Sequence, residues 1–361
     1  MSDTRHQGRL VGLDVVRGVA LIGVCTMNYH GYLINRGGER GTGWMRVLDP
    51  WNGPLSTRFA ATFVVAAGVG ISLLSADARR TRHSGTISAR RLTLVRRGVV
   101  LLSGGMILDW VWPGTILFFY GGYFLVSALL ITLADRWLVV VAALSAIGAT
   151  AVRWWVMTRS DDGYDTSWLL YADGERNRSP RDLVLDLVVR GTHPLLPWLA
   201  FLCLGMLLGR RLPLAGPARV TWAFGGVLAA LVGYGLAVAL PVDQVLRGTD
   251  PFEWALPYTL TAGGTAVVAV IAITVLAERH PTAIATRALA TTGRTTLTLY
   301  VLHALVFNLV VDWLGWVEPG SAWNGPLLAL AFWLAAVLMA NAWASRHEHG
   351  PLEAAYRAFS R

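Results

Sequence analysis

The sequence predicts an all-α, polytopic membrane protein with about ten transmembrane helices, and three observations support this prediction. Of its 361 residues, 54% are hydrophobic and 15% are charged, whereas a soluble domain usually carries about 25% charged residues. Apolar stretches of about eighteen residues recur along the whole chain, and each can span the roughly 30 Å hydrocarbon core of a bilayer. Arginine accumulates in alternate connections, as it does in the cytoplasmic loops of membrane proteins.

The apolar stretches define the predicted helices in order, because charged residues, glycine or proline interrupt the apolar run between them. The predicted spans are 11–33, 58–75, 97–112, 115–134, 137–156, 193–212, 220–240, 254–277, 293–315 and 323–345. No small-residue cleavage site follows the first stretch, so we expect a retained helix there. The polar remainder is too short for a soluble core of its own, and we expect one domain over 1–361.

The charges on alternate sides of these spans predict the orientation. The side that holds both termini has twenty arginines and seven acidic residues, and the other side has eleven arginines and fifteen acidic residues. Positively charged loops stay in the cytoplasm, so both termini are expected there, in a multi-pass protein of the cell (inner) membrane. Topology then explains the net charge of +9, and the expected partners are membrane lipids, with no nucleic acid.

The predicted cytoplasmic loop 76–97 is rich in arginine. Its charge sets the topology, and the same guanidinium groups suit the phosphates of a nucleotide-bearing carrier, so two compatible interpretations stand. The residues expected to bind acyl-coenzyme A are Arg90, Arg91, Arg96 and Arg97, with Arg17 deeper in the protein.

The predicted outer segment 157–192 contains a candidate interfacial helix from Pro180 to Arg190. Leucine and valine alternate there with aspartate and arginine, a pattern typical of a helix that lies at a membrane surface. This helix is interpreted either as a lid over an outward-facing site or as a packing strut.

The first predicted helix has an unusual density of polar residues for a membrane span. Asp14 and Arg17 are three residues apart and therefore share a helical face at the cytoplasmic end. The simpler interpretation is a topology-setting arginine that its neighbour neutralises. Gly18, directly after them, would let another backbone approach closely.

Asn28 and His30 lie near the outer end of the same helix. Imidazole can act as a nucleophile or general base at neutral pH, and an amide can donate to a developing oxyanion, so the pair offers what acyl transfer needs. On a regular helix the two side chains point about 200° apart. They can meet at one site only if the helix unwinds, and Gly31 favours that.

Other polar residues in or beside the spans are candidates to line the same site, although hydrogen-bonded packing explains each of them as well. They are Asp109, Tyr120, His193 and the mid-span His303. The two cysteines fall inside apolar spans and are interpreted as small core residues. The pair His347 and His349 lacks a third ligand, so no metal site is expected.

The first helix resembles the opening of the heparan-α-glucosaminide N-acetyltransferase family and of the related YeiB-like bacterial membrane proteins. The residues that carry the resemblance are the run from Arg9 to Ala20 followed by Met27-Asn28, then Trp51-Asn52-Gly53, Arg96-Arg97-Gly98 leading to Gly114 through Tyr120, and Gly293 through Tyr300. These four landmarks occur in the expected order and cover most of the chain.

The resemblance implies a transmembrane acyltransferase fold of about ten helices, commonly a homodimer. It also implies that acetyl-coenzyme A or another acyl-coenzyme A is the donor, and that the acceptor lies on the far side of the membrane. The family's helix-one asparagine maps onto Asn28. The family's histidine shortly before Trp-Asn-Gly has no counterpart, since Leu48 precedes Trp51 by three residues, with Asp49 beside it. Either His30 has taken over that role, or no histidine nucleophile is used.

The leading hypothesis is therefore an integral-membrane acyltransferase. His30 activates the acceptor or takes the acyl group, and Asn28 steadies the oxyanion. The residues expected to orient the acceptor, an amine or hydroxyl of a sugar, lipid or glycan, are Asp49, Asn52, Asp109 and His193.

The alternatives are a transporter or flippase with Asp14, Arg17, Asn28 and His303 along a polar path, and a protein that keeps the fold without the chemistry. Transporters commonly show two matching halves, and no such symmetry is visible.

Overall fold

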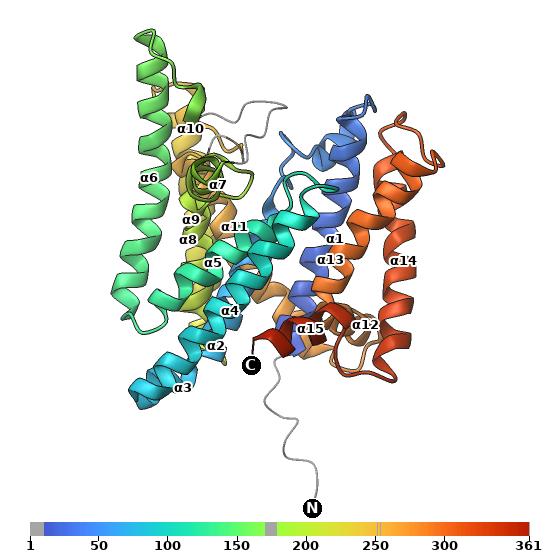
Figure 1. Ribbon diagram of the computed structural model, residues 1–361. Coiled ribbons are helices and arrows are strands. Elements are labelled where there is room, and N and C mark those ends of the chain that lie inside the picture. Colours follow the sequence, from blue (N-terminus) through green and yellow to red (C-terminus); the bar gives the residue numbers. More distant parts are fainter. Residues whose placement is uncertain (1–10, 170–178, 251, 253, 361) are drawn as a thin grey trace, which may run out of the picture. The chain divides into compact units, whose positions relative to one another are not determined.

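The computed structural model describes residues 11–169, 179–250, 252 and 254–360, and every regular element among them is a helix (Figure 1). The chain forms two compact units. Unit 1 comprises residues 1–66 and 268–355, and unit 2 comprises residues 67–267 and 356–361. Whether the two units form the single domain predicted over 1–361 is not decided by this division, so the single domain stays a prediction.

Unit 1 is built from the two ends of the chain. Helix α1 packs against α12, α13 and α14, so the first helix lies beside the last ones (Figure 1). The helices of this unit are α1 (Val11–Ile34), α12 (Ile284–Arg294), α13 (Thr296–Phe307) and α14 (Asn324–Ala344), with the short helix η1 (Gly43–Leu48) and the π-helical turn η4 (Asn308–Trp313).

Two glycines allow α1 and α12 to cross with their backbones in contact. The position that a Cβ would take at Gly18 lies 2.5 Å from the carbonyl oxygen of Leu289. A Cβ at Gly293 would overlap the carbonyl group of Asp14. The close approach predicted at Gly18 is therefore confirmed, and α12 is the helix that approaches.

The predicted span 293–315 is interrupted at its start, because α12 ends at Arg294 and α13 begins at Thr296. The carboxylate of Glu353 accepts hydrogen bonds from the backbone N–H of Leu297 at 2.6 Å and of Thr298 at 3.1 Å. The Thr298 hydroxyl donates to the same carboxylate at 2.6 Å. A carboxylate suits the N-terminus of a helix, where the first N–H groups have no partner within the helix. This contact fixes where α13 begins.

Unit 2 is built from the middle of the chain. Its main pairs are α4 with α5 and α6 with α8. Its helices are α3 (Ala76–Thr81), α4 (Ser84–Leu108), α5 (Ile116–Leu130), α6 (Asp135–Asp161), α7 (Pro180–Leu185) continued by the π-helical turn η3 (Asp186–Arg190), α8 (Leu195–Arg210), α9 (Gly216–Ala239) and α10 (Gln244–Arg247). Helices α2 (Arg58–Leu74), α11 (Leu256–Arg279) and α15 (Pro351–Phe359) each contribute residues to both units.

The arginine-rich segment 76–97, predicted as a cytoplasmic connection between two spans, is helical rather than irregular, and its place in the cytoplasm stays a prediction. Helix α3 and the first half of α4 cover it, with a break only at Arg82 and His83. Arginine is a good helix former, and the leucines between the arginines continue the helix without interruption into the apolar half of α4. In the outer segment, the predicted helix from Pro180 to Arg190 is confirmed as α7 and η3, while residues 170–178 lie outside the described residues.

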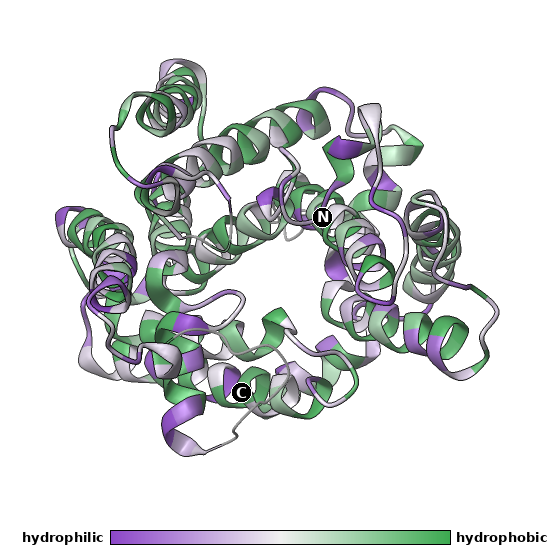
Figure 2. Cartoon of the chain, turned by 90° about the horizontal axis from the view of Figure 1, so that it is seen from above, coloured by the Kyte–Doolittle hydropathy of each residue, from purple (hydrophilic) through white to green (hydrophobic). Residues whose placement is uncertain are grey.

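Every predicted span lies largely within helices, with an interruption at the start of 293–315, and the helices differ in how well they suit a bilayer. Six of the described helices are long and apolar enough to cross a membrane, and a seventh span results if the bent pair 180–190 and 195–210 is one span. Helices α2 and α5 have 17 and 15 residues, which at about 1.5 Å per residue gives less than the hydrocarbon thickness. Apolar residues dominate the long helices (Figure 2). The structure is thus that of a multi-pass membrane protein.

The α1–α12 crossing predicts the effect of one substitution. Gly293→Ala should lower the free energy of unfolding by about 1–3 kcal/mol, because the new methyl group would overlap the carbonyl of Asp14. The matched control is Gly225→Ala in α9, where nothing described lies within 4 Å of the new Cβ; it should be neutral or slightly stabilising. Thermal unfolding in detergent would compare the two variants, and equal midpoints would contradict the close crossing.

Candidate active site

The candidate site in unit 1 is centred on a hydrogen bond between α1 and α13. The amide nitrogen Nδ2 of Asn28 lies 3.2 Å from Nε2 of His303. His303 is fully buried and Asn28 is half-buried. An interhelical hydrogen bond was one explanation predicted for a mid-span histidine, and this contact confirms it.

The other ring nitrogen of His303 fixes the tautomer. Nδ1 of His303 contacts the carbonyl oxygen of Tyr300, one turn earlier in α13. Because a carbonyl oxygen can only accept, Nδ1 carries the hydrogen and Nε2 keeps its lone pair. In neutral His303, Nε2 is therefore the acceptor for the amide group of Asn28.

Aromatic side chains enclose the pair. The Tyr29 hydroxyl donates to the backbone oxygen of His303 at 2.8 Å, and its ring stacks on the imidazole at a centroid distance of 5.9 Å. The ring of Tyr300 lies 4.7 Å from the imidazole, and that of Phe332 lies 6.5 Å away. The imidazole is thus held on several sides in a surrounding with little water, where hydrogen bonds are electrostatically stronger.

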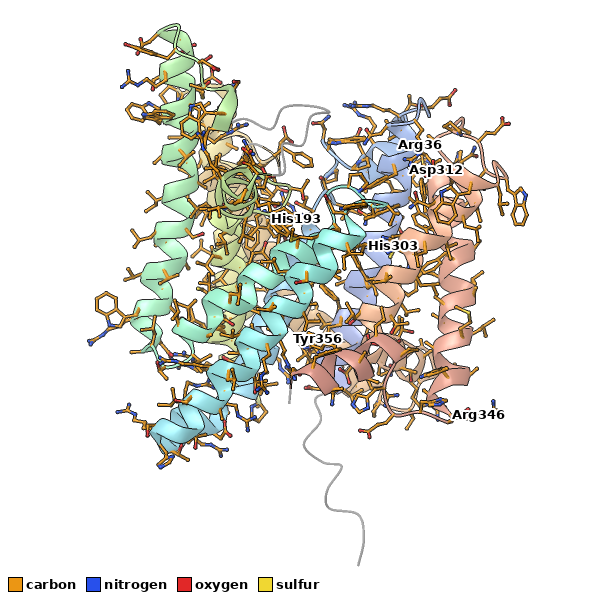
Figure 3. The ribbon with its side chains drawn as sticks, viewed as in Figure 1. Arg36, His193, His303, Asp312, Arg346 and Tyr356 are labelled. Atoms are coloured by element: carbon orange, nitrogen blue, oxygen red, sulfur yellow. The ribbon has the colours of Figure 1, made fainter. Side chains whose placement is uncertain are left out.

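An ion pair at one end of the unit joins the turn that follows α1 to η4, which continues α13. Arg36 binds Asp312 of η4 through Nε at 2.6 Å and Nη2 at 2.7 Å. His303 lies on α13 between this end, where Arg36 and Asp312 are found, and the end that carries Arg346 (Figure 3). The histidine is therefore at intermediate depth along the bundle of unit 1.

Helix α1 continues without a break past Gly31, so the unwinding expected there does not occur. Asn28 and His30 consequently point to different sides of the helix, and the prediction that these two side chains meet is wrong. The missing side chain at Gly31 instead makes room for Pro50, because a Cβ placed at Gly31 would lie 3.2 Å from the Pro50 ring. That glycine serves packing rather than a distortion of the helix.

His30 lies in its own buried environment, with 1% of its surface exposed. Its backbone packs against Gly325 at the start of α14. Its Nε2 atom has no hydrogen-bond partner among the described residues. Asp49 is close enough to interact electrostatically with the ring. A buried imidazole nitrogen without a partner is costly for stability alone, which makes it a candidate for binding a substrate.

Asp49 and Asn52 belong to one turn beside His30. Oδ1 of Asp49 accepts the backbone N–H groups of Trp51 and Asn52, each at 2.9 Å. Gly53 closes the turn by donating its N–H to the Asp49 carbonyl at 3.1 Å. The carboxylate that sequence analysis assigned to the acceptor therefore also builds the Trp-Asn-Gly turn.

Asp14 and Arg17 occupy the other end of α1. Nη1 of Arg17 lies 3.7 Å from Oδ1 of Asp14, and the Asp14 side chain is buried. The predicted neutralisation of Arg17 by its neighbour is confirmed. Arg17 precedes Asn28 by eleven residues, about 16 Å along the helix, so this ion pair is a separate feature.

In unit 2 the structure brings Asp109, Tyr120 and His193 into one region. Asp109 accepts the backbone N–H of Gly114 at 2.9 Å, and the Gly114 carbonyl accepts the hydroxyl of Thr192 at 3.2 Å. Nδ1 of His193 lies 3.0 Å from that hydroxyl oxygen. Tyr120 joins the region through Tyr123, whose hydroxyl donates to the His193 carbonyl at 2.6 Å.

The α4 arginines expected to bind acyl-coenzyme A lie in unit 2, where Arg90, Arg91 and Arg97 make the following contacts. Arg90 forms a two-pronged ion pair with Asp77, with Nη2 2.6 Å from Oδ2, and its hydrogen bonds hold the pKa of that carboxyl below its usual range. Arg91 donates to the Ala128 carbonyl at 3.1 Å, near the end of α5. Arg97 lies 5.4 Å from the ring centroid of Tyr356. Arg96 is exposed.

These contacts divide the expected site residues. Unit 1 holds Asn28, His30, Asp49, Asn52, His303, Asp14 and Arg17, and unit 2 holds Arg90, Arg91, Arg96, Arg97, Asp109, Tyr120 and His193. Sequence reasoning missed that His303 is the partner of Asn28. The available signal was that both are polar residues inside spans, each of which needs a partner away from water. Within the described residues, no group of three or more His, Cys, Asp or Glu side chains could hold a metal ion.

Two family models match the chain, and the boundaries of the matched segments differ from those of the two units. The model described as heparan-alpha-glucosaminide N-acetyltransferase, catalytic, matches residues 9–235. The model described as protein of unknown function (DUF418) matches residues 213–361. No curated protein matches the chain. Asn28 falls within the first matched segment and His303 within the second, so the hydrogen bond between them joins the two.

Proposed function

Because the chain belongs to the heparan-alpha-glucosaminide N-acetyltransferase catalytic family, we propose that it transfers an acyl group across the membrane. The donor is cytoplasmic acetyl-coenzyme A or another acyl-coenzyme A. The acceptor is an amine or hydroxyl of an extracytoplasmic sugar, lipid or glycan. A membrane acyltransferase is the activity that the family supports, and the identities of donor and acceptor are part of the proposal.

The hydrogen bond between half-buried Asn28 and fully buried His303 is the observation that supports this function most strongly. Acyl transfer passes through a tetrahedral intermediate whose oxygen becomes negative, and fixed N–H donors stabilise that oxygen. Asn28 carries such a donor at the position that corresponds to the family's helix-one asparagine. Polar groups inside apolar helices are costly to bury, and for that reason they commonly mark functional sites. This pair lies in the unit that also contains His30.

His30 is the proposed group that reacts. Because His30 and Asn28 point to different sides of α1, the proposal that both act on one acyl group requires α1 to unwind near Gly31 when the substrate binds. In the covalent route, Nε2 of His30 attacks the thioester carbonyl carbon, and the new N–C bond replaces the C–S bond as coenzyme A leaves as a thiolate and takes up a proton. The acceptor amine or hydroxyl then bonds to the acyl carbon, the N–C bond to histidine breaks, and the acceptor loses its proton. In the direct route, His30 removes that proton while the acceptor attacks the thioester.

The donor site is proposed at the arginines of α4, with Arg17 nearer to the membrane interior. A guanidinium group binds phosphate through two parallel N–H donors. Arg96 is exposed on α4, next to Arg97. Arg90 is partly neutralised by Asp77, so we expect it to contribute less than Arg96 and Arg97. The residues proposed to orient the acceptor are Asp49 and Asn52 in unit 1; in unit 2 the candidates for an acceptor site are Asp109, Tyr120 and His193.

The proposed topology has ten spans with both termini in the cytoplasm of a cell that carries the protein in its inner membrane. The excess of arginine on the side of the termini supports this orientation. Helices α2 and α5 would then be short spans, which cross where neighbouring helices or local thinning shorten the distance. The proposed oligomer is a homodimer, as the family resemblance implies.

Binding of the donor would be measured first. Acetyl-coenzyme A at a hundred times its dissociation constant should stabilise the detergent-purified protein by about 2.7 kcal/mol, seen as a rise in the unfolding temperature over an ATP control. Substituting Arg96→Gln together with Arg97→Gln should reduce the rise. Arg211→Gln is the matched control, because its side chain is 62% exposed in the same unit. No rise with acetyl or longer acyl thioesters would contradict the proposed donor.

Transfer would be measured by adding acetyl-labelled acetyl-coenzyme A to membranes that contain the protein and counting label in their lipid and glycan fractions. Asn28→Leu should lower turnover by about 10²–10³-fold, the effect of losing one oxyanion donor. His30→Ala should abolish turnover with the protein still folded. Asn341→Leu, which removes an exposed amide on α14, should leave the rate unchanged. A His30→Ala variant with normal turnover would exclude the role of His30.

A further inference from the structure

We infer that His303 is a positioning residue, which orients the amide group of Asn28 so that it donates to the acyl oxygen. This inference rests on the proposed acyl transfer and adds to it a residue outside the segment that matches the acyltransferase family. It assigns His303 a role distinct from that of His30, namely holding a donor in place rather than accepting a proton or an acyl group.

The first step of the argument is the direction of the hydrogen bonds. The Tyr300 carbonyl accepts from Nδ1 of His303, and this leaves the lone pair on Nε2. At 3.2 Å, Nε2 can therefore accept only from the NH₂ end of Asn28 and not from its oxygen. The three groups form a chain in which the carbonyl of Tyr300 sets the imidazole and the imidazole sets the amide.

The second step concerns the hydrogen of the Asn28 amide nitrogen that the bond to His303 does not use. Its nitrogen carries two hydrogens, and the bond to His303 uses one of them. The second hydrogen points about 120° away in the plane of the amide, a direction that the first bond fixes. Without an acceptor at Nε2, a carboxamide can exchange its oxygen and nitrogen ends by a half-turn about χ2 at little cost. His303 therefore decides which end of Asn28 faces a substrate.

The third step is that His303 itself cannot turn. Its ring is fully buried, lies against the rings of Tyr29 and Tyr300, and is held at Nδ1. The Tyr29 hydroxyl holds the backbone oxygen of the same residue. Because Tyr29 directly follows Asn28 in α1, one helix places both the amide and the hydroxyl against His303. A donor fixed in this way needs no reorganisation when negative charge develops, which is the condition for effective oxyanion stabilisation.

The variants His303→Gln and His303→Leu separate positioning from proton transfer. Gln can place a carbonyl oxygen near the position of Nε2 and accept from Asn28, whereas Leu has no acceptor. We expect His303→Gln to retain most of the turnover. His303→Leu should lose about 10²–10³-fold in kcat, with little change in KM, as for the loss of an oxyanion donor. Asn341→Leu again serves as the control for a lost amide in a span. If Gln is as inactive as Leu, or if Leu is fully active, the inference is wrong.

A second measurement does not depend on turnover. In protein labelled with ¹⁵N at histidine, His303 should show a protonated Nδ1 and an unprotonated Nε2 at neutral pH, and Asn28→Leu should shift the Nε2 signal. A protonated Nε2 and bare Nδ1 in the neutral ring would overturn the inference even in an active enzyme. The expected tautomer in a protein that transfers no acyl group would instead count against the proposed function, so the two failures can be told apart.

Discussion

A polar side chain inside a membrane span needs a partner, because neither lipid nor apolar side chains can satisfy its hydrogen bonds. In this protein that requirement joins α1 to α13 through Asn28 and His303. The rest of unit 1 is consistent with keeping the two helices in register. Gly18 and Gly293 let α12 approach α1, Glu353 fixes the start of α13, and Arg36 with Asp312 ties the turn after α1 to η4.

The same hydrogen bond joins residues from the two segments of the chain that match different family models. Unit 1 is formed by residues that are more than two hundred positions apart in sequence, and the asparagine and histidine come from opposite ends. The segment that matches the acyltransferase family ends before α13, and the model of unknown function covers α13. Each matched segment therefore contains only one residue of the pair Asn28 and His303. The second segment is accordingly proposed to complete the active site rather than to form an independent domain.

The sequence predicted the helices well, because an apolar run of sufficient length leaves the chain few alternatives. It also predicted the close approach at Gly18 and the ion pair of Asp14 with Arg17, which depend on local spacing. It failed where long-range contacts decide. Gly31 suggested an unwound helix, but the chain uses it to pack Pro50, and Asn28 meets His303 instead of His30. The charge of the arginines of 76–97 predicted a connection between spans, and their helix propensity with the following apolar residues makes that connection helical. No pattern in a single sequence shows which two distant helices share a hydrogen bond.

The central claim is that Asn28 and His303 act as one unit in acyl transfer. A double-mutant cycle with Asn28→Leu, His303→Leu and both together, read as the rate of label transfer from acetyl-coenzyme A, tests it most directly. If the two side chains act together, the double variant should be no slower than the slower single variant, because either substitution already removes the oriented donor. Losses that multiply in the double variant would show that the residues act independently, and they would contradict this account of the site.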